Sequence, residues 1–153
     1  MIHLREHLPE DFTALRSIFN DPDVIKYVSK NYCFSDDQLK KMISPDEEVK
    51  NIKQFSAIYN ECMVGSCMYK FNNEMNFYEI GYAVLKEHRG KGLALKITKS
   101  LIEKIKSDDC VKELYAKVAL DNVNSVRVLI KLGAKKDREV NYDGSIELIY
   151  RIF

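Results

Sequence analysis

The sequence lacks the features that mark membrane, secreted and nucleic-acid-binding proteins. No apolar run approaches the ~20 residues needed to cross a bilayer, and residues 1–12 contain no apolar core of a secretory signal. The formal net charge is only +1 over 153 residues, which argues against a protein dedicated to nucleic acid or to anionic membranes. We therefore expect a cytoplasmic protein without such partners.

Cysteine and histidine are also sparse, with four and three residues. None of Cys33, Cys62, Cys67 and Cys110 forms a C-x-x-C pair, and the histidines do not cluster with them in the sequence. Zinc sites need such clusters. The sequence therefore predicts no metal site and four reduced thiols.

Linkers, internal repeats and low-complexity tracts are absent too, so the length predicts one domain over residues 1–153. Alternating apolar residues predict strands over 1–8, 52–59, 62–71, 77–84, 111–120, 135–142 and 145–153. Helical spacing and capping residues predict helices within 9–20, 21–30, 35–43, 91–106 and 122–133, and a polar loop over 44–51.

Several of these strands are joined by connections too short for a crossover. Asn60-Glu61 and Asp143-Gly144 predict tight hairpin turns. Short connections join antiparallel strands. We therefore expect an α/β (α+β) fold with a mixed, mostly antiparallel central sheet of about seven strands, flanked by helices.

The stretch RGKGLA, residues 89–94, lies between a predicted strand and the longest predicted helix. A Walker A loop needs a glycine where Leu85 stands and a Ser or Thr where Gly92 stands, so this interpretation fails. A dinucleotide fingerprint needs a third glycine where Leu95 stands, so this second interpretation is weak.

A third pattern, [QR]-x-x-G-x-[GA], is satisfied by Arg89, Gly92 and Ala94. Unpaired N–H groups and the macrodipole at a helix N-terminus bind phosphate. Gly90 and Gly92 lack the Cβ atoms that would hold a pyrophosphate away, and Arg89 and Lys91 add positive charge. The competing interpretation is a glycine turn that only starts the helix.

Three segments together resemble the GNAT superfamily of N-acetyltransferases, and are most similar to its ribosomal-protein-alanine N-acetyltransferase-like branch. They read LREHLPEDFTALRSIFNDPDVIKYV, EIGYAVLKEHRGKGLALKITKSLI and DNVNSVRVLIKLGA. The resemblance covers nearly the whole chain and is most specific over residues 78–133. Two departures are Ala134, where an aromatic residue is usual, and the short length of the chain.

The resemblance implies that acetyl-CoA, as co-substrate, passes its acetyl group directly to a primary amine of a small molecule or a protein N-terminus. It implies Glu79 as general base, the competing interpretation being a solvated strand glutamate. It implies a backbone N–H near Ala83, Val84 or Leu85 as donor to the thioester oxyanion. The implied cofactor-binding residues are Ala83, Val84, Leu85, Arg89, Gly90, Lys91, Gly92, Leu93, Ala94, Asn122 and Ser125.

The proton donor to the leaving thiolate is less clearly marked. Leu129 stands where many members of the family carry a tyrosine, so the resemblance implies Ser125 instead, as in the ribosomal-protein branch. Asn122 matches the family's asparagine that binds the pantetheine arm. Both residues also fit an ordinary helix N-cap region.

Two questions are left open by the sequence. The alternative to an enzyme is a non-catalytic module that binds or senses acyl-CoA. The amine acceptor is not indicated, and the protein is expected to be a monomer or a homodimer, the latter through pairing of an exposed final strand.

Overall fold

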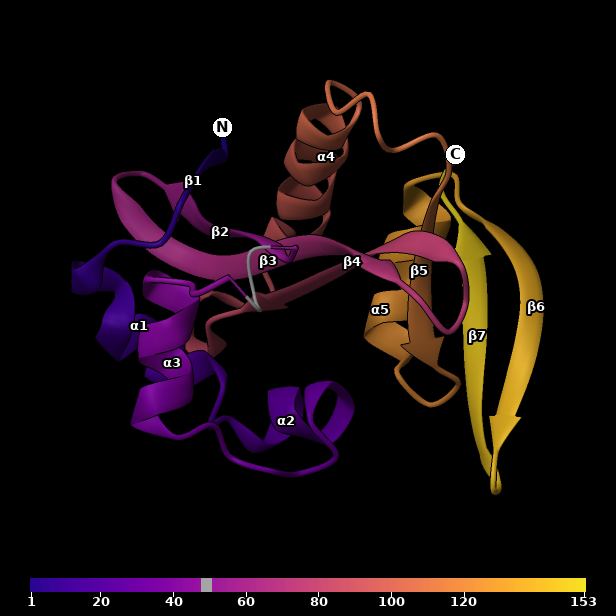
Figure 1. Ribbon diagram of the computed structural model, residues 1–153, viewed down its shortest axis with the longest axis horizontal. Coiled ribbons are helices and arrows are strands. Elements are labelled where there is room, and N and C mark those ends of the chain that lie inside the picture. The colour runs from indigo at the N-terminus through magenta and orange to yellow at the C-terminus, as the bar shows by residue number, and fades with distance from the viewer. Residues whose placement is uncertain (48–50) are drawn as a thin grey trace.

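The computed structural model describes residues 1–47 and 51–153 (Figure 1). Residues 48–50, inside the predicted polar loop, lie outside the described residues. Within the described residues, seven strands form one sheet in the order β1-β2-β3-β4-β5-β7-β6, and only the β4–β5 pair is parallel. The strands are β1 (His3–Arg5), β2 (Lys53–Tyr59), β3 (Cys62–Asn72), β4 (Phe77–Val84), β5 (Leu114–Ala119), β6 (Lys135–Tyr142) and β7 (Ser145–Arg151).

The predicted α/β class and the mostly antiparallel seven-stranded sheet are confirmed. The first strand is shorter than predicted, because the Leu8 N–H donates to the Asp11 carboxylate at 2.8 Å and the chain turns away from the sheet. The helices are α1 (Phe12–Ile18), α2 (Pro22–Val28), α3 (Asp36–Ile43), α4 (Leu93–Ile105) and α5 (Val123–Lys131), with 3-10 turns at Pro9–Asp11 and Lys86–His88.

The helices cover the two faces of the sheet separately (Figure 1). The apolar stripe of α4, including Ile97 and Leu101, is completely buried in one core with α5 and one face of the sheet. Helices α1 and α3 pack on the opposite face, around Leu15, Leu39 and Leu85. None of the helices in residues 1–47 and 51–153 has the length and apolar character that a bilayer crossing requires.

Both predicted hairpins form, with positive φ at Asn60, Glu61, Asp143 and Gly144. The expectation of an exposed final strand is wrong, because β7 inserts between β5 and β6. The edge of the sheet next to β7 is formed by β6, which is mostly exposed and carries the charges of residues 135–139. Its register shifts between Lys136 and Arg138. Charges and a bulge on an edge strand oppose pairing with another chain.

The parallel pair β4–β5 is joined over two rows only, Tyr78 with Leu114 and Glu79 with Tyr115. Figure 1 shows the strands of the β5–β7–β6 group running steeply across those of the β1–β4 group. The last residues of β4 therefore have β3 on one side and no strand ladder on the other. This divergence creates the site described below.

A buried polar network holds the N-terminal segment against β2. Ser56 Oγ donates to Asp11 Oδ2 at 2.8 Å, and both oxygens of Asp11 accept from Arg5, at 2.7 and 3.0 Å. His7 Nδ1 lies 2.7 Å from Ser56 Oγ. Because the Ser56 proton is used toward Asp11, His7 must donate from Nδ1, and its buried Nε2 has no partner among the described residues.

Candidate active site

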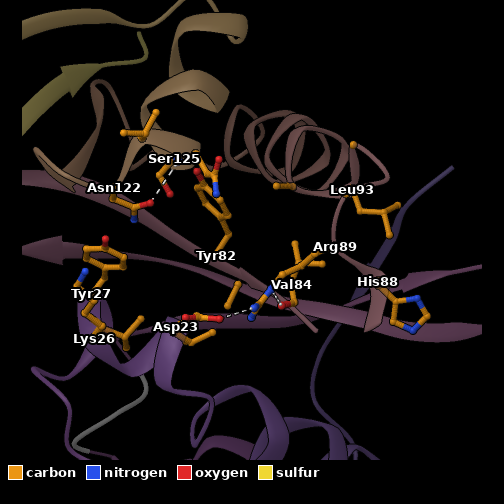
Figure 2. Close-up of a pocket in the computed structure, with 18 of the residues that line it drawn as sticks. Asp23, Lys26, Tyr27, Tyr82, Val84, His88, Arg89, Leu93, Asn122 and Ser125 are labelled. Carbon is orange, nitrogen blue, oxygen red and sulfur yellow. Dashed lines mark hydrogen bonds and ion pairs between the residues drawn. The ribbon is translucent and has the colours of Figure 1, made fainter. Parts of the chain in front are cut away.

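A crevice of about 740 Å³ opens where β4 and β5 diverge (Figure 2). Its walls are helix α2, the end of β4, the loop before α4 and the first turn of α5. Of the predicted site residues, it is lined by Ala83, Val84, Arg89, Gly90, Gly92, Leu93, Ala94, Asn122 and Ser125. Its volume is in the range of small-molecule and cofactor sites. The structure thus brings most of the predicted binding residues to one place.

The glycine loop before α4 has the geometry that the anion-binding interpretation needs. Gly90 and Gly92 have φ values of 76° and 73°, a region that favours glycine, and a Cβ on either would point into open space. Gly92 caps α4, and within the described residues no side chain bonds to its cap. The first N–H groups of α4 therefore face outward.

The Arg89 side chain does not point into open solvent beside this loop. Its Nε donates to the Val84 carbonyl at 3.1 Å, and its NH2 donates to Asp21 Oδ2 at 2.8 Å. NH1 reaches Asp23 at 3.5 Å. Arg89 thus ties the end of β4 to the N-terminus of α2, as Figure 2 shows for Val84 and Asp23. Lys91 is exposed and does not line the crevice.

Backbone direction along β4 narrows the choice of oxyanion donor. The Leu85 N–H donates to the Val64 carbonyl of β3 at 2.8 Å. Since alternate residues of an antiparallel strand bond to the same neighbour, Ala83 also directs its N–H toward β3. The Val84 N–H then points to the opposite side, into the crevice. Of the three predicted amides, Val84 is the one with the required direction.

The first turn of α5 forms the other wall. Asn122 Oδ1 accepts from the Ser125 N–H at 3.4 Å, so Asn122 does cap the helix, while both residues also line the crevice. Tyr82 extends from β4 toward Ser125 (Figure 2). Burial raises the pKa of the Tyr82 phenol, and the nearby Ser125 hydroxyl acts in the opposite direction. The buried Tyr82 oxygen has no well-aligned partner among the described residues.

Glu79 lies on the other face of β4 from Tyr82 and is not part of the crevice wall. It is buried, with 8% of its surface exposed, so it is not a solvated strand glutamate. Lys70 of β3 is its cross-strand neighbour, with Nζ 3.8 Å from Glu79 Oε1. Tyr82 is three positions after Glu79 in the strand, which corresponds to ~10 Å.

The sequence suggests that the N-terminal helices and Tyr27 could contribute to an acceptor pocket, but it does not indicate Asp23 or Lys26 as site residues. Asp23, Lys26 and Tyr27 line the crevice, and Lys26 Nζ lies 3.5 Å from Asp121 Oδ2 at the start of α5. In the sequence, the pattern at these positions indicates only a short amphipathic helix. Their approach to α5 is a tertiary contact, for which the sequence carries no local signal.

Comparison with known proteins identifies the family. A model described as an acetyltransferase (GNAT) domain matches residues 2–135. The chain belongs to the GNAT acetyltransferase family. This confirms the resemblance and makes the protein an acetyl-CoA-dependent acyltransferase, for which acetyl-CoA is the co-substrate.

Three relatives illustrate the relationship. The uncharacterized N-acetyltransferase p20 of Bacillus licheniformis is 28% identical over 140 residues, which are 88% of this chain and 79% of that protein. The structure of a GNAT-family acetyltransferase from Bacillus anthracis has a TM-score of 0.82 at 19% identity, over 99% of this chain and 94% of that one. Spermidine N-acetyltransferase from Vibrio cholerae, solved with CoA and spermine, has a TM-score of 0.79 at 17% identity, over 98% and 92%.

The residues of this GNAT protein fit a CoA molecule. The open space above Gly90 and Gly92 leaves room for a pyrophosphate at the outward N–H groups of α4. The crevice continues from there past Val84 to Asn122 and Ser125. When bound, acetyl-CoA supplies an activated acetyl thioester. Everything else that the reaction requires must come from the protein and the acceptor.

Proposed function

We propose that this GNAT enzyme transfers the acetyl group of acetyl-CoA directly to a primary amine of a small molecule or of a protein N-terminus. One observation carries the proposal: an uncapped glycine-rich helix start and the Val84 N–H open into the same crevice. One end can hold a diphosphate, and the other can hold a developing oxyanion. The spermidine N-acetyltransferase, which has the same fold, binds a polyamine beside CoA.

The N–H groups of the first turn of α4 bind the pyrophosphate, with the helix dipole favouring its negative charge. Arg89 contributes its backbone and, through its side chain, the position of the loop against α2. Asn122 contributes its side-chain amide to the pantetheine arm while its oxygen caps α5.

Glu79 removes the proton from the acceptor amine through water. Deprotonation at pH 7 costs about 4–5 kcal/mol for a lysine-like amine and roughly 1 kcal/mol for an α-amine, so a base matters more for the first. A relay is needed because ~10 Å of strand lies between Glu79 and the crevice wall at Tyr82. The amine nitrogen then bonds to the acetyl carbon, and the Val84 N–H stabilises the oxyanion.

The carbon–sulfur bond breaks as this intermediate collapses, and the thiolate takes up a proton. A thiol with a pKa near ~8.5 leaves without much help, so proton donation contributes less than it would for an alkoxide. The Ser125 hydroxyl is the donor that we propose. It lines the crevice, and the buried Tyr82 phenol lies beside it.

The proposal is tested by incubating the protein with acetyl-CoA and a panel of amines and peptides while free thiol is measured. We expect at least one class of primary amine to accelerate thiol release, with mass spectrometry detecting its acetylated product. Protection by CoA against thermal unfolding without amine-dependent thiol release would instead describe a binding module.

A further inference from the structure

The phenol oxygen of Tyr82 is buried without a partner. In the part of the chain that the structure describes, only this oxygen and His7 Nε2 are buried side-chain polar atoms that lack a hydrogen bond. Of these two residues, only Tyr82 lines the crevice. Its ring packs against the core that β4 shares with α4 and α5. A phenylalanine would make the same ring contacts without burying an unpaired hydroxyl, which destabilises a fold. Packing therefore accounts for the ring of Tyr82 but not for its hydroxyl.

This hydroxyl lies where the sulfur of a bound thioester would be. The Tyr82 side chain extends from β4 toward Ser125, in the first turn of α5 (Figure 2). Val84, whose N–H faces the crevice, follows Tyr82 by two positions on the same strand. In a thioester, the carbonyl oxygen and the sulfur are bonded to the same carbon. An oxygen held by the Val84 N–H therefore places the sulfur in the part of the crevice that Tyr82 and Ser125 line.

We infer that the Tyr82 hydroxyl completes a proton relay, in which it supplies the proton that Ser125 passes to the CoA sulfur. This inference rests on the proposed function, since it takes Ser125 as the donor. The electron pair of the carbon–sulfur bond moves to sulfur, sulfur takes the Ser125 proton, and Ser125 Oγ takes the phenol proton. The phenolate regains a proton from solvent after the product leaves the crevice. Tyr82 acts through Ser125 and is therefore a positioning residue.

Acidity explains why a second hydroxyl is needed. An aliphatic hydroxyl holds its proton about as tightly as water, whose pKa is ~15.7. A phenol has a pKa of ~10 and a thiol of ~8.5. Ser125 alone would be left as an alkoxide, which is far more basic than the thiolate, whereas a phenolate is close to it. Burial raises the pKa of Tyr82, and Ser125 lowers it because its hydroxyl can donate to a phenolate, which is the state that the relay leaves.

The experiment measures the binding of CoA and of desulfo-CoA, which lacks the sulfur, by calorimetry at pH 6 and pH 9.5, and needs no amine. At pH 9.5 free CoA is mostly a thiolate, which accepts a charge-assisted hydrogen bond from Ser125. Ser125→Ala should reduce the preference for CoA over desulfo-CoA about tenfold, the effect of one such bond. Tyr82→Phe should reduce it about threefold, because Tyr82 polarises the Ser125 hydroxyl. The double variant should match Ser125→Ala, and at pH 6 the preference should be the same in all these proteins.

The kinetic counterpart uses the amine that is most active in the panel. Tyr82→Phe should slow thiol release in a single turnover about tenfold, which is less than general acids usually contribute because a thiolate leaves readily. Its affinity for desulfo-CoA should stay at the wild-type value. Its free energy of unfolding in urea should be unchanged or higher, because the variant removes an unpaired buried hydroxyl.

Tyr69→Phe is the matched control, because it removes a phenol that donates to Asp108 at 2.7 Å and does not line the crevice. It should lower the free energy of unfolding and leave the CoA preference unchanged. A preference that Tyr82→Phe does not alter, or a double variant that binds CoA less well than Ser125→Ala, would overturn the relay alone. Wild-type protein that binds neither ligand would overturn the crevice as the CoA site, and the proposed function with it.

Discussion

Arg89 and Asp21 form a 2.8 Å ion pair that joins the glycine loop before α4 to the N-cap of α2. The Asp21 side chain is only 9% exposed. The same guanidinium holds the Val84 carbonyl at 3.1 Å, at the point where β4 faces the crevice. One side chain therefore fixes three walls of the site: the end of β4, the loop and α2.

The first prediction concerns this pair. A double-mutant cycle with Arg89→Gln and Asp21→Asn should give a coupling of about 1 kcal/mol in urea unfolding, because the pair is largely shielded from solvent. Asparagine keeps the α2 cap, so the cycle isolates the ion pair. Arg151 and Glu113 form the control, being 3.2 Å apart but about half exposed. Their cycle should give almost no coupling, and equal couplings in the two cycles would contradict the structural role of Arg89.

The second prediction concerns Gly92. A valine there should abolish protection by CoA against thermal unfolding, since its side chain would occupy the space where the pyrophosphate approaches. Ligand at 100 times its Kd stabilises a protein by ~2.7 kcal/mol, a shift that is easily measured. Gly144→Val is the control, because Gly144 also has positive φ, 91°, but lies in the distant β6–β7 turn. It should lower the melting temperature and keep the CoA shift. A normal CoA shift in Gly92→Val would argue against the loop as the phosphate site.

The third prediction concerns Glu79. Glu79→Gln should lower kcat/KM at neutral pH by ~10²-fold or more, the range of general base catalysis, and change CoA affinity far less. The defect should shrink at high pH, where the amine is already deprotonated. Glu147→Gln is the control, because it changes a carboxylate on the same face that pairs with Lys117. Its decrease in kcat/KM should be smaller and independent of pH. Wild-type rates in Glu79→Gln, with an unchanged pH profile, would remove Glu79 from the mechanism.

The fourth prediction concerns stability in acid. Burial lowers the pKa of His7, Arg5 adds to this effect and Asp11 opposes it. Since the folded state binds this proton more weakly than the unfolded chain, the contribution of neutral His7 is complete above ~6.5 and is lost as pH falls below that value. The free energy of unfolding should therefore decline between pH 7 and pH 5. His7→Asn keeps a donor to Ser56 and should flatten this decline, whereas exposed His3→Asn should not. Equal slopes in all three proteins would exclude His7 as the cause.

Asp11 also contributes to the free energy of unfolding, and this contribution is lost at a lower pH than that of His7. Burial alone would raise the pKa of Asp11, but hydrogen bonds from Arg5, the Leu8 amide and Ser56 outweigh it and hold the pKa at about 2. Its stabilising effect is present above the unfolded pKa of ~3.9 and is lost as pH falls toward 2. Asp11→Asn should therefore cost stability at pH 6 and much less near pH 2, as measured by urea unfolding.

Most of the fold could be predicted from the sequence because its signals are local. The four-residue spacing of Leu93, Ile97, Leu101 and Ile105 predicts α4, and the four side chains are all buried. Asp143-Gly144 predicts the last hairpin, which requires the positive φ that these residues adopt. Such features depend on a few neighbouring residues and do not require knowledge of the rest of the chain.

The parts that the sequence did not predict depend on distant contacts. In the β6–β7 hairpin, it is β7 that pairs with β5, so β7 lies between β5 and β6. The sequence of residues 135–153 alone does not determine which of the two strands joins the sheet. The sequence gives no sign of the ion pairs of Arg89, because its partners Asp21 and Asp23 are 68 and 66 residues away. Lys70, the cross-strand neighbour of Glu79, comes from β3, so its approach depends on register.

The divergence of β4 and β5 has a consequence for the ligand itself. Past Glu79, the backbone of β4 pairs with a strand on one side only in the part of the chain that the structure describes. The pantetheine arm of CoA is an extended chain with its own amide groups, and between the two strands it would act as a guest strand that completes the ladder. Hydrogen exchange at the Val84 amide should then slow on binding. The second side of β4 would then be hydrogen-bonded only while the co-substrate is bound.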